Sequence, residues 1–230
     1  MSDVTVILFD IDGTLLGMPG VGRQSFVRAL DTTFGIKDNL DYINFSGNTD
    51  LNVLQQIMAH HGLPLTQDDC VRFHRQLPLE LAQASHQARL ILYPGIREVL
   101  EALSTRPDVV LGLVTGNVEA CAWIKLQQFN LHNHFVLGAF GDEHSERNKI
   151  AQLAMERVLS RLKPGYAVKA CFLVGDTPND IEAAHAIGAV AVGVATGRHS
   201  VDELTSAGAD VALSDLSDTA CVLGLFLQVR

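Results

Sequence analysis

The chain has 230 residues, of which 47% are hydrophobic and 19% charged, and its formal net charge at pH 7 is −9. This apolar content is enough for a hydrophobic core and excludes a disordered chain. Nucleic acid is bound through clustered Lys and Arg, so the negative charge and the lack of a five-residue basic run disfavour a nucleic-acid surface, and we expect no nucleic-acid partner.

The first predicted element is a strand over Val4–Phe9, where five of the six residues are apolar, as in a fully buried strand. Asp10 and Asp12 follow it, and because side chains two apart on an extended chain point the same way, both can face one site. Gly13 allows a sharp turn and a close approach of its N–H to an anion. With Thr14, these residues suit a metal-and-phosphate site, although Asp-Gly after a strand is also an ordinary turn signal.

The segment from residue 17 to residue 92 breaks the pattern, because it contains no convincing buried strand. It shows helical patterns only, over Gly22–Phe34, Thr49–His61 and Thr66–Arg89. A connection of this length is far longer than an ordinary loop between strands. We therefore expect residues 17–92 to form an inserted helical cap above the strand ends. Residues 1–16 and 93–230 are then expected to form the catalytic core.

In the rest of the chain, strands and helices alternate. The predicted strands cover Val109–Val114, Ala170–Val174, Val190–Ala195 and Ala209–Leu213, and the predicted helices cover Gly95–Ser104, Val118–Phe129, Asn148–Leu162, Pro178–Ile187 and Asp202–Ser206. This alternation predicts an α/β fold with a doubly wound, Rossmann-like parallel sheet. Ligands of such sheets bind beyond the carboxyl ends of the strands.

Polar residues follow two of these later strands. Thr115, Gly116 and Asn117 can hold phosphate oxygens at a strand-to-helix turn, although Thr and Asn also cap helices. Asp176 follows a buried strand directly and adds a third carboxylate to the same sheet edge. Asp180 is a further acid, which an ordinary role at a helix N-terminus explains equally well. Hard oxygen ligands without His or Cys favour Mg²⁺ over zinc.

A phosphate site also needs a cation to neutralise its charge. Arg147 and Lys149 begin the helix that precedes the third strand, and either can serve, although both also suit a solvated helix start.

Together, these motifs resemble those of the haloacid dehalogenase superfamily, specifically its phosphatases with a helical cap inserted after the first strand. The segment from Phe9 to Thr14 is similar to the first motif, Thr115 to Asn117 to the second, and Gly175 to Asp180 to the fourth. Many relatives close the third motif with Lys-Pro, which is absent here. The Arg-Asn pair resembles another branch and favours Arg147.

The resemblance implies a role for each position. Asp10 would attack phosphorus and form an aspartyl-phosphate, and Asp12 would protonate the leaving oxygen and then deprotonate water. Asp10, Asp176 and the backbone carbonyl of Asp12 would bind Mg²⁺, with Asp180 close behind. Thr115 and Arg147 would hold the transferring phosphoryl group. The other residues expected at the phosphate or the substrate are Gly13, Thr14, Gly116, Asn117, Lys149, Arg23 and Asn48.

Several other activities are less compatible with these residues. A dehalogenase would not need Asp12 or the metal acids, and a phosphonatase would need a cap lysine in a matching context, which Lys37 does not have. A sugar-phosphate mutase would carry an arginine where Asp50 stands. A non-catalytic phospho-ligand-binding module would have lost an acid, and none is lost. A phosphatase is therefore favoured, with a mutase as the alternative.

The expected substrate is a small phosphate ester, with phosphoglycolate as the leading candidate. We expect a cytoplasmic protein with no membrane segment, because the first apolar run is too short for a signal or a span. The cysteines form no C-x-x-C pair and are expected to be reduced, with Cys121, Cys171 and Cys221 buried. The sequence does not specify an oligomeric state, and a monomer is compatible with it.

Overall fold

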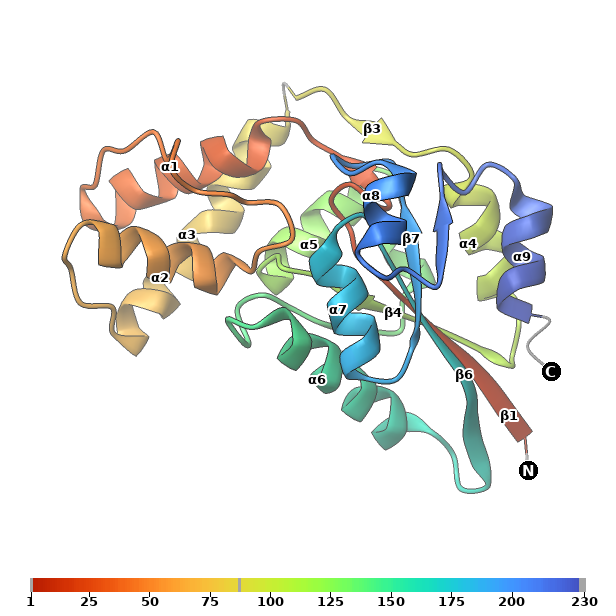
Figure 1. Cartoon of the computed structure of the whole chain (residues 1–230). Helices are drawn as coiled ribbons and strands as arrows, with labels where there is room; N and C mark the ends of the chain where they lie inside the picture. The colour runs from red at the N-terminus through yellow and green to blue at the C-terminus, as the bar shows by residue number, and fades with distance from the viewer. Residues whose placement is uncertain (1, 87, 228–230) are drawn as a thin grey trace.

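A computed structural model describes residues 2–86 and 88–227, and in these residues the core is a six-stranded sheet of order β5-β4-β1-β6-β7-β8. All neighbouring strands are parallel. The strands are β1 (Ser2–Phe9), β4 (Val109–Val114), β5 (Leu137–Ala139), β6 (Tyr166–Gly175), β7 (Val190–Val194) and β8 (Val211–Leu213). The predicted parallel α/β sheet is confirmed (Figure 1).

Helices cover both faces of this sheet. One face packs against α6 (Arg147–Arg161), α7 (Pro178–Ala186) and α8 (Val201–Ser206), and the other against α4 (Ile96–Ser104), α5 (Glu119–Gln127) and α9 (Thr219–Leu227). In β1, Val6 and Leu8 pack on the face covered by α6, α7 and α8, and Ile7 and Phe9 pack on the opposite face. Because both faces are buried, the strand is apolar throughout instead of alternating.

The segment between β1 and β4 is mostly helical. It contains α1 (Val21–Phe34), α2 (Asp50–His60) and α3 (Gln67–Ser85), which lie to one side of the sheet (Figure 1). The rings of Phe26 and Phe73 pack 5.2 Å apart between α1 and α3. The short strands β2 (Leu16–Gly17) and β3 (Ile91–Leu92) pair antiparallel, so the chain leaves the core and returns to it side by side.

Two elements of the core were not predicted. β5 has three residues, one of them glycine, which is too short for a recognisable apolar run. α9 is apolar almost throughout and shows no helical period. β6 begins at Tyr166 instead of Ala170, because its first residues are largely exposed and lack the apolar signal. A 3-10 turn (His132–His134) precedes β5.

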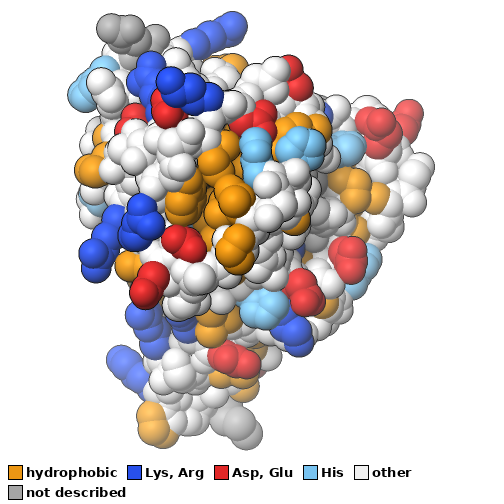
Figure 2. Space-filling model, turned by 90° about the vertical axis from the view of Figure 1, so that its left-hand side faces the viewer, with side chains coloured by type: hydrophobic (Ala, Val, Ile, Leu, Met, Phe, Trp, Pro, Cys, Tyr) orange, Lys and Arg blue, Asp and Glu red, His pale blue; other side chains and the backbone are white. Residues whose placement is uncertain are grey.

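On the face that Figure 2 shows, Lys and Arg side chains lie in separate groups with acidic side chains between them. None of the described helices is long and apolar enough to cross a membrane. The cysteines are free, but the expected burial is wrong for Cys221, which is exposed on α9, and Cys171 is half-buried.

Candidate functional site

A cavity of about 480 Å³ lies at the carboxyl ends of β1, β4 and β6. The strand ends supply Asp10, Thr115 and Asp176 to its wall, and the inserted segment supplies Phe26 and Phe45. The sheet therefore gathers three of the predicted polar residues from distant parts of the chain into one cavity, as expected for a doubly wound fold.

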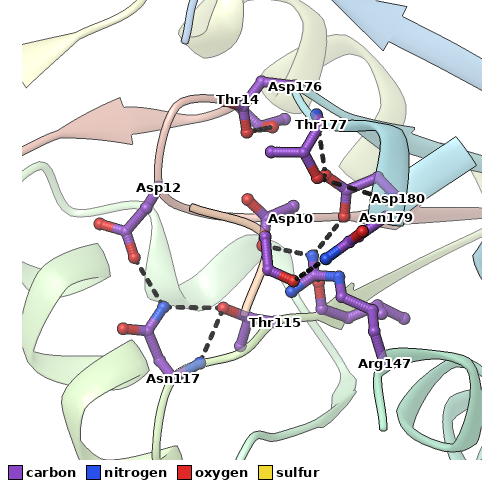
Figure 3. A network of polar contacts seen from close by, with 12 residues as sticks. Asp10, Asp12, Thr14, Thr115, Asn117, Arg147, Asp176, Thr177, Asn179 and Asp180 are labelled. Carbon is purple, nitrogen blue, oxygen red and sulfur yellow. Dashed lines mark hydrogen bonds and ion pairs between the residues drawn. The ribbon is translucent and has the colours of Figure 1, made fainter. Parts of the chain in front are cut away.

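Asp10 and Arg147 form a buried ion pair in this cavity (Figure 3). Nη2 of Arg147 donates to Oδ1 of Asp10 at 2.7 Å, to the carbonyl of Val114 at 3.1 Å, and to Oδ1 of Asp180. Nε of Arg147 is also buried, and it has no hydrogen-bond partner among the described residues. A buried N–H without an acceptor is rare, and this one is free to donate to the oxygen of a bound water or ligand.

Asp176 sits between two glycines. A Cβ on Gly13 would lie 2.3 Å from Oδ2 of Asp176, and one on Gly197 would lie 1.7 Å from it, so no side chain fits at either position. Gly13 has φ +88° and its N–H donates to the carbonyl of Leu16 at 2.9 Å. The expectation that this N–H approaches an anion is therefore wrong; Gly13 instead makes room for Asp176.

Asp180 has both of its carboxylate oxygens engaged. Oδ2 accepts from the backbone N–H of Thr177 at 3.1 Å and from its hydroxyl at 2.6 Å, and Oδ1 accepts from Arg147. Thr177 and Asp180 thus form the capping box of α7. The helix-start explanation of Asp180 holds, and at the same time the residue orients the guanidinium beside Asp10.

The negative charge of the buried acids at this site exceeds the positive charge that contacts them. Oxygens of Asp10, Asp176 and Asp180 lie within 4.8 Å of one another, and Arg147 forms ion pairs with Asp10 and Asp180. Burial raises the pKa of Asp10 from 3.8 to about 7, although Arg147 opposes the shift. Burial and the charge of Asp10 raise the pKa of Asp176 to about 8. Three hard oxygen donors with an excess of negative charge fit a divalent cation such as Mg²⁺.

The Asp12 carboxylate lines the same cavity but has different partners (Figure 3). Nδ2 of Asn117 donates to Oδ2 of Asp12 at 2.7 Å and to Oγ1 of Thr115 at 2.7 Å. The backbone N–H of Asn117 also donates to Oγ1 of Thr115, at 3.3 Å. Since Thr115 accepts both bonds, its own O–H remains available to donate.

Lys125 is a residue of this site that the sequence analysis missed. Its side chain is 6% exposed, and its ammonium donates to Oδ2 of Asp12 at 2.5 Å and to Oδ1 of Asn117 at 2.6 Å. A signal was present in the sequence: Lys125 shares the buried face of α5 with Cys121 and Ala122, at helical spacing. A lysine on such a face needs a charged partner.

Of the remaining predicted residues, some line the cavity and others lie outside it. Gly116, Asn48 and Arg23 line the cavity, but the guanidinium of Arg23 donates to the carbonyls of residues 39, 40 and 43. Thr14 lies behind the cavity wall and donates to Asp176 at 3.4 Å. Lys149 is exposed and donates to Gln152, so the structure brings Arg147 to the site and leaves Lys149 outside it.

The inserted segment contacts the core through the start of α2. The N–H groups of Asp50 and Leu51 donate to the carbonyls of Gly116 and Gly141, at 2.7 Å and 3.1 Å. In return, Oδ2 of Asp50 accepts from the N–H of Val118 at 2.8 Å. The first N–H groups of a helix have no partner inside the helix, and here the core supplies acceptors for two of them.

Replacing Gly116 by alanine tests this contact, because the added Cβ would lie 2.0 Å from the carbonyl oxygen of Asn48. We expect Gly116→Ala to displace the start of α2 and to lower kcat/KM by about 100-fold, the size of effect that a displacement of roughly 1 Å can have. Steady-state kinetics measure this. Gly22→Ala is the control, because its Cβ meets no atom within 4 Å. Equal activity of the two variants would contradict the prediction.

Known proteins of similar sequence include hydrolases and phosphatases. The family model described as haloacid dehalogenase-like hydrolase matches residues 7–194. A "Probable phosphatase IndB" of Dickeya dadantii is 29% identical, over 93% of this chain and 90% of its own. A phosphoglycolate phosphatase of Synechococcus elongatus is 28% identical, over 92% of this chain and 93% of its own.

Among solved structures, a hydrolase from Pseudomonas syringae superposes with a TM-score of 0.70 at 23% identity, over 97% of this chain and 99% of the other, and it shows the same fold. Because the family model covers most of the chain, the chain belongs to the haloacid dehalogenase-like hydrolases.

Proposed function

We propose that the protein is a Mg²⁺-dependent hydrolase of small phosphate monoesters. The observation that carries the proposal is the buried Asp10 carboxylate, which is held by Arg147 at 2.7 Å and opens into a cavity that Asp12 and Thr115 also line. The names of the two relatives point to the same class of reaction.

In the first half-reaction, a carboxylate oxygen of Asp10 attacks the phosphorus atom. A bond forms between this oxygen and phosphorus, the ester P–O bond breaks, and the leaving oxygen takes its electron pair. The O–H of Thr115 and the N–H groups of Arg147 donate to the phosphoryl oxygens. Positioning and charge neutralisation supply most of the acceleration in such transfers.

Asp12 manages the protons of both half-reactions. It gives a proton to the leaving oxygen and then accepts one from the water that attacks the phosphorus of the aspartyl-phosphate. This attack breaks the bond between phosphorus and the Asp10 oxygen and releases inorganic phosphate. Its side chain is 44% exposed and faces the cavity, which suits a group that must reach both the alcohol and the water.

Mg²⁺ would be held by Asp10, Asp176 and the backbone carbonyl of Asp12, with Asp180 supporting the site from behind. When bound, it would neutralise the negative charges of the phosphoryl group and the acids. The cluster of acids, their raised pKa values and the glycines around Asp176 support this assignment.

Residues 17–92 would act as a cap on the core, made of residues 1–16 and 93–230. The cavity has walls from both parts, so closure of the cap would exclude bulk water during the transfer to Asp10 and would select the leaving group. In this role, Asn48 would contact the substrate, whereas Arg23 would stabilise the loop after α1, because its guanidinium is bonded to carbonyls there.

Phosphoglycolate is the leading candidate substrate, following the name of the Synechococcus relative. Its carboxylate requires a cation at some distance from Asp10. Arg198, which lines the cavity and is exposed, is a suitable group. Arg198 was not among the site residues expected from the sequence. A sugar-phosphate mutase is the alternative, but the acid Asp50 would lie where such an enzyme grips a second phosphate.

Turnover of a panel of phosphate monoesters, with and without Mg²⁺, tests the proposal. We expect phosphate release from small esters in the presence of Mg²⁺, with phosphoglycolate among the best substrates. Interconversion of glucose phosphate isomers without net hydrolysis would establish the mutase. Stoichiometric binding of an ester without turnover would establish a binding module. Either result would contradict the hydrolase.

A further inference from the structure

Among the described residues, hydrogen-bond donors contact the Asp12 carboxylate at one of its two oxygens. Its Oδ2 accepts from both Lys125 and Asn117, at 2.5 Å and 2.7 Å. The side chain remains 44% exposed at the cavity, so the other oxygen is the one that a substrate can reach. Two donors on one oxygen set the rotation of the carboxylate and direct its second oxygen away from α5.

Lys125 also sets the orientation of the Asn117 amide. An ammonium can only donate, so the amide atom that it contacts at 2.6 Å must be the oxygen. The NH₂ group is therefore directed toward Asp12 and Thr115. Without Lys125, the amide could flip, and both Asp12 and Thr115 would face a carbonyl oxygen in place of a donor.

The ammonium remains charged in this buried position. Burial acts to lower the pKa of Lys125, but the charge and hydrogen bond of Asp12, together with the charge of Asp50, more than offset this effect, and the pKa is raised. Asp50 belongs to the inserted segment and contacts Val118 at the start of the helix that carries Lys125. A lysine needed only for packing would be a costly choice at a site with 6% exposure.

We propose that Lys125 is the positioning residue of Asp12: it orients the carboxylate, through a direct bond and through Asn117, so that the free oxygen passes its proton to the leaving group. The inference rests on the proposed hydrolase function, in which Asp12 protonates the leaving oxygen as the P–O bond breaks. Lys125 itself does not touch the reacting atoms.

Lys125→Met tests the role, because methionine has a similar length and flexibility but no donor. The variant is compared with the wild type on an alkyl phosphate, whose leaving oxygen needs a proton, and on p-nitrophenyl phosphate, whose leaving group departs as a stable anion. General acid catalysis is worth about 100-fold or more. We expect kcat/KM to fall by roughly that factor for the alkyl ester and by less than about threefold for the aryl ester, because kcat/KM reports the transfer to Asp10 and not the later hydrolysis of the aspartyl-phosphate that both esters share.

Lys149→Met is the matched control, since Lys149 is exposed and lies outside the cavity, and it should change neither rate. In an Asp12→Asn background, Lys125→Met should cause no further loss on the alkyl ester, because the residue acts through Asp12. If Lys125→Met does not fold, the same comparison is made with Lys125→Gln.

Equal losses of kcat/KM on both esters would overturn the positioning role and leave the hydrolase standing. Independent losses in the Asp12→Asn background would also overturn it. A wild-type protein that hydrolyses neither ester would instead overturn the proposed function, and the inference with it.

Discussion

Asp10→Asn is expected to abolish turnover, with kcat lowered by at least about 10⁴-fold, because the amide cannot attack phosphorus as the carboxylate does. The side chain keeps nearly the same shape, and its carbonyl oxygen can still accept from Arg147. The fold should therefore remain. Phosphate release under saturating ester and Mg²⁺ measures the loss.

Two controls make this result specific. Asp68→Asn changes an exposed acid at the start of α3 and should leave kcat unchanged. Thermal unfolding of the Asp10→Asn variant should remain cooperative, which excludes misfolding as the cause. A variant that retains more than a few per cent of the wild-type rate would show that another group is the nucleophile.

Removal of divalent cations is expected to abolish activity and to change how stability depends on pH. The acids Asp10 and Asp176 have pKa values of about 7 and about 8 in the folded protein, against an ordinary value of 3.8. Between these values, the folded state holds protons that the unfolded state has released. The free energy of unfolding of the metal-free protein should therefore fall as pH rises from about 4 to about 8.

Mg²⁺ should reverse part of this trend. It binds the ionised acids of the folded state, so its stabilising effect grows as the pH rises through the same window. The pKa of Asp50 is also raised to about 7, mainly by burial, so Asp50 too lowers the free energy of unfolding as the pH rises. Mg²⁺ should not offset this part of the loss, because Asp50 lies outside the acid cluster. Thermal unfolding with EDTA and with Mg²⁺, at several pH values, separates the two parts.

Asp176→Asn provides the matched variant for this experiment. It removes one proposed ligand and one acid with a raised pKa, so both the stabilisation by Mg²⁺ and the pH dependence without metal should decrease. An unchanged response to Mg²⁺ in this variant would show that the cation binds elsewhere. Full activity of the wild type in EDTA would contradict the metal requirement itself.

Helical spacing in the sequence is sufficient to predict some site residues that lie outside the motifs. Arg147 lies three and four positions before Ile150 and Ala151, which α6 buries against the sheet, so the three share one helix face. Lys149 lies two positions further along, which is about 200° around a helix, and it therefore points to solvent. The same spacing places Lys125 with the buried residues of α5.

Other contacts had no local signal. The bond between Asp50 and Val118 joins residues 68 positions apart and exists only because the start of α2 docks on the loop after β4. The engagement of Arg23 with carbonyls of residues 40 and 43 likewise depends on the path of the loop after α1. Neither residue type nor spacing predicts such a path.

Asp10 and Asp12 follow a strand whose apolar residues identify it as buried, and Asp176 follows another, so the sequence by itself determined which acids meet at the sheet edge. Short-range periodicity was sufficient, because parallel strands bring their carboxyl ends together. Only the tertiary structure decided the partners: Arg147 for Asp10, and Lys125 for Asp12. These pairs depend on how α5 and α6 pack on the sheet, which is set by long-range burial.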